Sequence, residues 1–306
     1  MISIKEVRYK NFGKCLFISN DLMEVLVTVD IGPRIIKCNL KGKENMMFED
    51  VERNFSNDVS SMFGEEKTWY TYGGHRIWLS PEGFPETYYP DNDKVLYSTF
   101  PGGAEFVPPV QDVTGIQISV KLEMAEDKPE IKLTHKITNT KETSMNGAVW
   151  CLSVMAPGGA AFVPQPTEDT GLLPNRALVM WPYARFTDSR FTITDKYLVV
   201  AQDEKAADAF KLGINNTNGH SAYINKGQAL VKYVEYQNGG EYPDGGCSTE
   251  VYTNNLFEEL ETLSPLYTLA SGETMVHTET WKLFDGIEIC EKTDASLGKL
   301  AEKLFG

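Results

Sequence analysis

The sequence predicts an all-β protein, a large antiparallel sandwich with one short C-terminal helix. Apolar and polar residues alternate with a period of two along many segments, as in strands that bury one face. Clusters of Gly, Pro, Asn and Asp separate these segments and predict turns. Helical periodicity is confined to short stretches. These three observations together favour a sandwich of antiparallel strands.

The clearest strand pair is predicted at residues 116–124 and 131–138. Apolar side chains occupy every second position of the first segment, from Ile116 to Met124, and the second repeats the pattern. The turn-forming Glu-Asp-Lys-Pro sequence between them predicts a hairpin. Further strands are expected at 2–9, 14–19, 22–30, 33–40, 146–155, 177–181, 197–201, 228–236, 248–253, 256–263 and 274–284.

Helical segments are expected at only two places. Residues 203–210 are long enough for two helical turns. In residues 294–305, Leu297, Leu300 and Leu304 lie on one helical face, and Asp294 is the expected N-cap. We expect this C-terminal helix to pack onto the sandwich.

The strand pattern runs through the whole chain, and no Pro/Ser-rich linker interrupts it. We therefore expect residues 1–306 to form a single domain. A propeller requires a repeat of blade length, which the sequence lacks, so a sandwich is preferred.

Composition restricts the kind of partner. The chain has 29 basic and 43 acidic residues, a formal net charge of −14. Such a surface repels phosphate backbones and anionic lipid, so we expect no nucleic-acid partner and no membrane partner. A neutral or cationic small molecule is favoured instead. No particular oligomeric state is predicted.

The cysteines and histidines are scattered. Five cysteines without paired spacing, and a charged N-terminal segment, favour a reduced, cytoplasmic protein. The four histidines lack the spacing of a transition-metal site, so no metal is expected from them, although loop carboxylates leave calcium open.

The densest group of functional side chains lies in residues 68–82. Its members are Trp69, Tyr70, Tyr72, His75, Arg76, Trp78 and Glu82, around the pair Gly73-Gly74. Aromatic faces beside hydrogen-bonding charged groups suit a sugar, which has apolar C–H faces and a rim of hydroxyls. Glycines allow the backbone to approach a ligand closely. We therefore predict a binding site here; the alternative is that these aromatic side chains fill one end of the sandwich.

A second candidate lies in residues 242–263. Glu259 and Glu261 are two apart and share one face of the expected strand. A carboxylate of this strand that faced a cleft would be a candidate base, because burial there would tune its pKa. The alternative is that these glutamates form the solvated face of an outer strand.

Several segments resemble proteins of the galactose mutarotase-like (aldose 1-epimerase) superfamily, and an uncharacterised branch of it in particular. These segments are 32–42, 72–82, 137–159, 172–183, 242–254 and 260–283, which extend over nearly the whole chain. The resemblance implies a supersandwich of two large antiparallel sheets. It also implies interconversion of sugar anomers without a cofactor, in which a carboxylate takes the anomeric proton and a histidine protonates the ring oxygen.

The resemblance assigns roles to particular residues. Glu261, in a Leu-Glu-Thr context, is similar to the family's catalytic glutamate, and His75 is the candidate acid. The candidate substrate-binding residues are Arg76, Glu82, Trp69, Tyr72, Trp150, Lys232 and Asp244. The family's second histidine has no counterpart in residues 147–154, where this sequence reads Gly-Ala-Val-Trp-Cys-Leu-Ser-Val.

Three hypotheses follow. The first is an aldose mutarotase or related sugar epimerase, in which Glu261 and His75 face a common cleft. The second is a carbohydrate-binding module that uses the same cleft without catalysis, as the missing histidine suggests. The third is an interaction protein whose C-terminal helix binds a partner.

Overall fold

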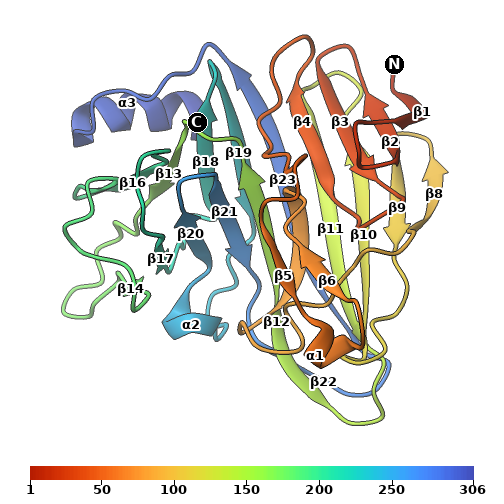
Figure 1. Cartoon of the computed structure of the whole chain (residues 1–306). Helices are drawn as coiled ribbons and strands as arrows, with labels where there is room; N and C mark the ends of the chain where they lie inside the picture. Colours follow the sequence, from red (N-terminus) through yellow and green to blue (C-terminus); the bar gives the residue numbers. More distant parts are fainter.

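Two large antiparallel sheets form the body of the fold (Figure 1). The computed structural model describes all residues from 1 to 306. The first sheet has eleven strands in the order β1-β2-β3-β4-β7-β12-β21-β20-β17-β14, and β22 pairs with β12 beside this path. Its strands are β1 (Ser3–Arg8), β2 (Lys14–Ser19), β3 (Met23–Thr28), β4 (Ile35–Leu40), β7 (Gly74–Ser80), β12 (Met145–Met155), β14 (Leu178–Met180), β17 (Phe210–Ile214), β20 (Thr249–Thr253), β21 (Glu258–Leu263) and β22 (Tyr267–Leu269).

The second sheet has ten strands in the order β15-β16-β13-β18-β19-β23-β11-β10-β9-β8. These are β8 (Leu96–Phe100), β9 (Gly103–Val107), β10 (Ile116–Met124), β11 (Glu130–Asn139), β13 (Ala160–Pro164), β15 (Phe191–Ile193), β16 (Tyr197–Ala201), β18 (His220–Asn225), β19 (Gln228–Val234) and β23 (Thr274–Asp285). The predicted hairpin is confirmed as β10 and β11, paired from Ile116↔Asn139 to Met124↔Ile131.

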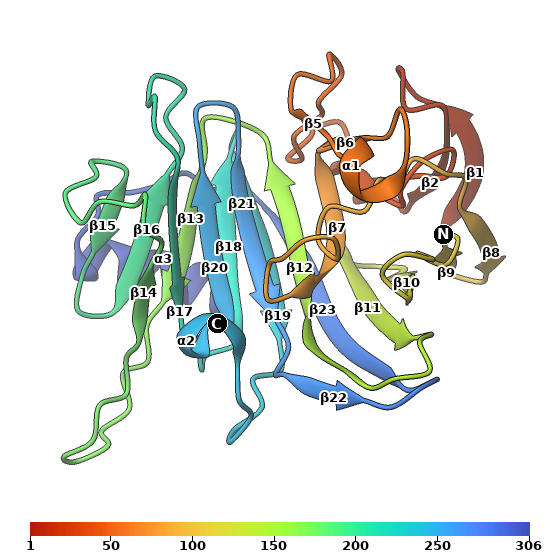
Figure 2. The same ribbon diagram turned by 60° about the horizontal axis from the view of Figure 1, so that its bottom comes forward.

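Two short strands and two short helices lie beside strands of the first sheet. β5 (Ser56–Asp58) pairs with β6 (Thr68–Tyr70), and α1 (Ser60–Phe63) connects them; α2 (Pro243–Gly246) precedes β20. Figure 2 shows β5, β6 and α1 beside β7, where Trp69 of β6 packs on Trp78 with ring centroids 5.8 Å apart. Residues 203–209 form turns and loop rather than the expected helix.

The main apolar core lies between the two sheets. The first sheet contributes Val25 and Leu260, for example, and the second contributes Leu122, Leu133 and Leu283. Side chains of the first sheet that alternate with these core residues point away from the second sheet. The fold is therefore the expected all-β sandwich of two large antiparallel sheets.

The C-terminal helix α3 (Asp294–Phe305) packs on the outer face of the second sheet (Figure 1). Leu297, Leu300 and Leu304 are buried in one cluster with Phe162 and Val231. The N-cap is Thr293, whose hydroxyl accepts from the Ser296 amide, one residue before the expected Asp294. None of the helices has the length and apolar character that a membrane crossing requires.

Candidate functional site

Polar side chains gather on the outer face of the first sheet. Leu152 of β12 pairs with Arg76 of β7 on one side and with Glu261 of β21 on the other, and Glu261 pairs with Glu250 of β20. Directly paired residues of antiparallel strands lie on the same face. Leu260 packs in the inter-sheet core, so this polar row points away from the second sheet.

Two adjoining cavities of about 310 and 360 Å³ lie over this face. They share Glu82, Tyr88, Trp150, Trp181 and Lys211 as lining residues, and we call the two together the cleft. Each cavity is in the size range of small-molecule sites.

Aromatic side chains form much of the wall of the cleft. Trp78 lies between Trp69 and Trp150, with ring centroids 5.8 and 5.4 Å away, and Tyr88 stands 5.6 Å from it. The guanidinium carbon of Arg76 lies 3.9 Å from the Trp78 ring centroid. The cleft therefore offers flat apolar surfaces beside a fixed hydrogen-bond donor, the combination that a sugar ring requires.

Lys211 joins two carboxylates behind this wall. Its Nζ lies 2.8 Å from Oε2 of Glu250 and 3.0 Å from Oε2 of Glu261, and Trp150 Nε1 donates to the same Glu261 oxygen at 2.6 Å. The Nζ also lies 4.5 and 4.6 Å from the ring centroids of Trp150 and Trp181. Glu250 and Glu261 are fully buried, and Oε1 of each has no hydrogen-bond partner. A ligand hydroxyl would satisfy such an oxygen.

The ionisation of these groups follows from burial and charge. Burial alone would lower the pKa of Lys211, but Glu261 and Glu250 raise it above its ordinary value. Burial holds the pKa of Glu250 well above its usual range against the opposing effect of Lys211. Lys211 is therefore a permanent cation, and Glu250 holds a proton more readily than an ordinary glutamate does.

Glu259 lines the first cavity of the cleft together with Glu82, whereas Glu261 lines neither cavity. It lies two residues before Glu261 on the same face of β21, and its Oε1 is 3.7 Å from Nη2 of Arg76. Burial, followed by the negative charge of Glu261, raises the pKa of Glu259 to about 7. Burial lowers the pKa of Arg76 to about 10, so Arg76 is still charged at neutral pH.

Glu82 and Asp244 lie at the second cavity. Glu82 accepts from the hydroxyl of Tyr88 at 2.5 Å. Asp244 is half-buried and has a φ of 52°, a left-handed conformation that a non-glycine residue adopts rarely. The structure thus brings together five predicted substrate-binding residues and Glu261. The residues concerned are Arg76, Glu82, Trp69, Trp150 and Asp244.

His75 lies on the opposite face of the first sheet, so the expectation that it shares a cleft with Glu261 is wrong. Ser153 of β12 pairs with His75 of β7 on one side and with Leu260 of β21 on the other. Paired residues share a face of the sheet, so His75 lies on the same face as Leu260, which packs in the core. Its Nε2 is 2.9 Å from Nε2 of His135 on the second sheet. Consecutive strand residues point to opposite faces, so the position of Arg76 in the cleft places His75 in the core.

Lys232 also lies in the core rather than at the cleft. Its Nζ donates to the Leu260 carbonyl at 2.9 Å and to Oε1 of Glu279 at 3.1 Å. Thr262 and Trp281 donate to the two oxygens of Glu279 at 2.6 and 2.9 Å. Lys232 lowers the pKa of Glu279 below its ordinary value although burial opposes this. The pair is therefore a fully hydrogen-bonded, neutral unit.

The core histidines form a chain of hydrogen bonds with one consistent proton arrangement. His135 Nδ1 donates to the His277 carbonyl at 3.2 Å, so its Nε2 accepts from His75. His75 Nδ1 then accepts from Ser153 at 2.9 Å. Burial lowers the pKa of His75 well below its ordinary range and that of His135 to about 4, which keeps both rings neutral.

The core around the histidines contains side chains of the kinds that bind metal ions in proteins. One donor atom each of His75, His135, Cys151 and Glu279 lies within 4.8 Å of the others. Both ring nitrogens of each histidine are already hydrogen-bonded, however, and an ammonium group already compensates Glu279. The chain's own groups satisfy this cluster, and its donor set does not call for a metal ion.

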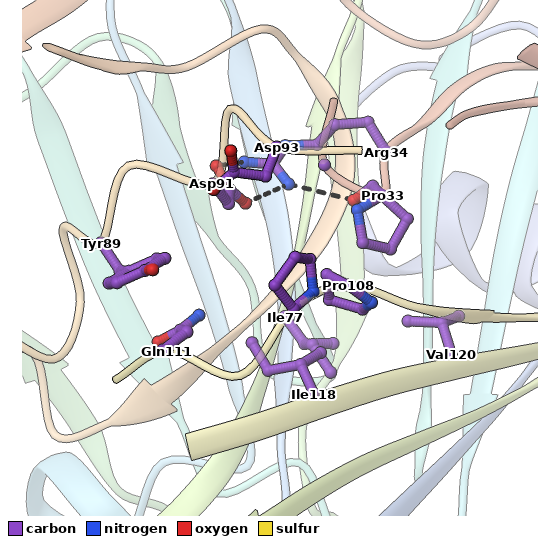
Figure 3. Close-up of a pocket in the computed structure, with 12 residues that line it drawn as sticks. Pro33, Arg34, Ile77, Tyr89, Asp91, Asp93, Pro108, Gln111, Ile118 and Val120 are labelled. Atoms are coloured by element: carbon purple, nitrogen blue, oxygen red, sulfur yellow. Dashed lines mark hydrogen bonds and ion pairs between the residues drawn. The ribbon is translucent and has the colours of Figure 1, made fainter. Parts of the chain in front are cut away.

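Tyr72 lies outside the cleft as well. Its hydroxyl donates to Oδ1 of Asn92 at 2.7 Å, and its ring lies under the Arg53 guanidinium. A separate cavity near this region is lined by Arg34, Asp91 and Ile118, and the Arg34 guanidinium donates to Oδ1 of Asp91 at 2.9 Å (Figure 3). With about 20 Å³, this cavity has room for a water molecule but not for a sugar.

The sequence predicts no site role for Lys211, Glu250 or Trp181, and it places Glu259 beside Glu261 without assigning a role to it. The alternation of β21 already placed Glu259 beside Glu261, and this signal would have identified it. Trp181 lies in segment 172–183, whose resemblance to the superfamily assigns it no site role, and Lys211 lies in a stretch without a recognisable motif. Only the pairing of β17 with β20 brings Lys211 to the two glutamates.

Comparisons with known proteins bear on the fold. No family model matches the chain, and no curated protein matches it. A candidate aldose 1-epimerase from Klebsiella pneumoniae matches 99% of this chain and 87% of its own, at 12% identity and a TM-score of 0.59. A galactose mutarotase-like protein from Lactobacillus casei matches 88% and 100%, at 10% identity and a TM-score of 0.53.

A TPR-domain containing protein from Parabacteroides distasonis matches 90% of this chain at 11% identity and a TM-score of 0.59. This chain spans only 48% of that protein's length. At such identities the matches establish the fold alone. The two sheets, their antiparallel pairing and these structural neighbours show that the chain has the galactose mutarotase-like fold.

Proposed function

We propose that this protein binds a carbohydrate in the cleft and acts on it as an aldose mutarotase or related sugar epimerase, with Glu261 as the base and no cofactor. The observation that carries the proposal is the setting of Glu261 directly behind an aromatic cleft. Trp150 and Lys211 hold its Oε2, while its buried Oε1 has no partner. Glu261 itself lines neither cavity, so a sugar hydroxyl must reach this oxygen past Trp150 and Lys211.

The lining of the cleft supports a sugar ligand. Trp69 and Trp150 provide flat surfaces for the C–H face of the ring, and Arg76, Glu82 and Asp244 are suited to hydrogen bonds with its hydroxyls. The carboxylates at the site outnumber the cations, and Arg76 and Lys211 are already paired with glutamates. A neutral sugar therefore suits the cleft better than a uronate or a sugar phosphate.

The test is the rate at which freshly dissolved α-sugars equilibrate, followed by polarimetry or NMR exchange. We expect the wild-type protein to exceed the buffer rate for at least one neutral hexose or pentose, and the corresponding uronate to be a poorer substrate. Glu261→Gln should reduce the enzymatic rate by about 10²–10⁴-fold, the usual contribution of a positioned base. Glu142→Gln, at an exposed loop position, is the matched control. Wild-type rates equal to buffer for every sugar would refute the proposal.

A second candidate is a non-catalytic carbohydrate-binding module. It is favoured by one observation, that no histidine lines either cavity of the cleft. This candidate requires sugar affinity in calorimetry, or sugar-induced stabilisation in thermal unfolding, without any increase in the equilibration rate. Absence of both affinity and turnover would eliminate the module and the enzyme together.

A further inference from the structure

Opening of a sugar ring requires an acid as well as a base. The inference below rests on the proposed function, in which Glu261 accepts the anomeric proton and another group protonates the ring oxygen. His75 points into the core and does not reach the cleft. Arg76 and Lys211 hold their protons too tightly, because the pKa of Arg76 is about 10 and that of Lys211 is raised.

Glu259 has the position that this acid requires. Its side chain lines the cleft, on the same strand and the same face as Glu261. Residues two apart on a strand are separated by about 7 Å, so the two carboxyls can flank one sugar ring. Oε1 of Glu259 lies 3.7 Å from Nη2 of Arg76. We propose that Glu259 is the proton donor to the ring oxygen and that it forms the catalytic pair with Glu261.

The protonation behaviour of Glu259 supports this role. Burial and the neighbouring Glu261 raise its pKa to about 7, and the Arg76 cation opposes them. Glu259 therefore keeps its proton to a higher pH than an ordinary glutamate does. A carboxyl whose surroundings raise its pKa towards neutral pH is suited to act as a general acid.

The proposed step balances in protons and bonds. Glu261 takes the proton of the anomeric hydroxyl, the electrons of that O–H bond form the carbonyl, and the bond between the anomeric carbon and the ring oxygen breaks. Glu259 gives its proton to the ring oxygen, which leaves as a hydroxyl. After rotation about the adjacent C–C bond, that hydroxyl attacks the other face of the aldehyde, Glu259 recovers its proton, and Glu261 returns its own.

The experiment compares Glu259→Gln and Glu259→Asp with wild type and with the control Glu142→Gln. Equilibration rates are measured from pH 5 to pH 9, and sugar affinity is measured by calorimetry on the same samples. The wild-type rate should fall as pH rises through about 7, because the protonated form of Glu259 is lost. Glu259→Gln should lose about 10²-fold or more in rate, with affinity changed only a few-fold, and should lack this alkaline limb. Glu259→Asp should recover part of the rate.

A second readout does not depend on turnover. In protein labelled with ¹³C at glutamate carboxyls, the signal that disappears in Glu259→Gln should titrate near pH 7 and shift when sugar is added. A wild-type rate and an unchanged alkaline limb in Glu259→Gln would overturn the role of Glu259, while a low rate in Glu261→Gln would leave the proposed function intact. If the wild-type protein equilibrates no sugar, the proposed function fails and this inference fails with it.

Discussion

Lys211 compensates two buried carboxylates with one ammonium group. Glu250 and Glu261 are fully buried, and each has one oxygen within 3.0 Å of Nζ. Removing one partner of a buried ion pair leaves an uncompensated charge in the protein. This costs more stability than replacing both partners with apolar residues of similar size. The side chain is therefore essential to the stability of the first sheet as well as to the site.

We predict that Lys211→Met lowers the free energy of unfolding by about 3–5 kcal/mol. The loss should be visible in urea unfolding at pH 7, followed by tryptophan fluorescence. Adding Glu250→Gln should recover part of the stability, because it replaces a buried carboxyl that has lost its ammonium partner with a neutral amide. Lys205→Met, at an exposed position, should change the value by no more than about 0.5 kcal/mol. A Lys211→Met protein as stable as wild type would contradict this account.

Gly73 and Gly74 pack against neighbouring backbone and not against the cleft. The pair was expected to let the backbone approach a ligand, but it allows close packing of neighbouring backbone instead. A Cβ at Gly73 would lie 2.1 Å from the Phe48 carbonyl oxygen, and one at Gly74 would lie 2.4 Å from that of Ile35. The glycines therefore position β7, and through it Arg76, without contacting the cleft.

At the scale of elements, α3 covers an apolar part of the second sheet. Its three leucines are buried against β13 and β19 of the same chain. This packing removes the sequence feature behind the third hypothesis, because the apolar face of the helix is already occupied.

We predict that Leu297→Ala, in the first turn of α3, lowers the free energy of unfolding by about 2–5 kcal/mol. The side chain is fully buried, so its removal leaves a cavity between helix and sheet. Thermal and urea unfolding measure the change, and Glu302→Ala on the exposed face is the control. Equal stability of the two variants would show that the helix does not dock as described.

At the scale of the whole molecule, the core histidines make stability depend on pH. Burial lowers the pKa of His135 to about 4, whereas an unfolded histidine titrates near 6.5. The unfolded state therefore binds more protons than the folded state between these values. The stability that neutral His135 contributes is complete above pH 6.5 and is lost as pH falls towards 4. Glu250 and Glu258, whose pKa values burial raises, have the opposite effect.

Comparison of wild type with His135→Gln isolates the histidine, because the contribution of the glutamates cancels. We predict that the stability difference between the two proteins shrinks by about 1.4 kcal/mol per pH unit between pH 6.5 and pH 4. Urea unfolding at half-unit intervals measures it. His277→Gln, at a group whose pKa burial also lowers to about 4, should behave in the same way. A difference that is independent of pH would mean that His135 is not buried as a neutral ring.

The sequence by itself determined the fold class, most strand positions, and the segment at 68–82 from which Trp69, Arg76 and Glu82 enter the cleft. The period of two, the turn residues and the resemblance over nearly the whole chain were sufficient for this. Long-range strand pairing decided the rest, because Lys211 and Glu250 meet Glu261 only through β17 and β20.

The tertiary structure alone decided which face of each strand meets the cleft. Every residue of β21 is buried, and so are the first four residues of β7. The reason is that one face of each strand packs in the core and the opposite face lies at the cleft. Burial on both faces removes the apolar–polar alternation that would distinguish them. A shift of one residue exchanges the two faces of a strand, so the adjacent His75 and Arg76 were equally good candidates in sequence and lie on opposite sides of the sheet.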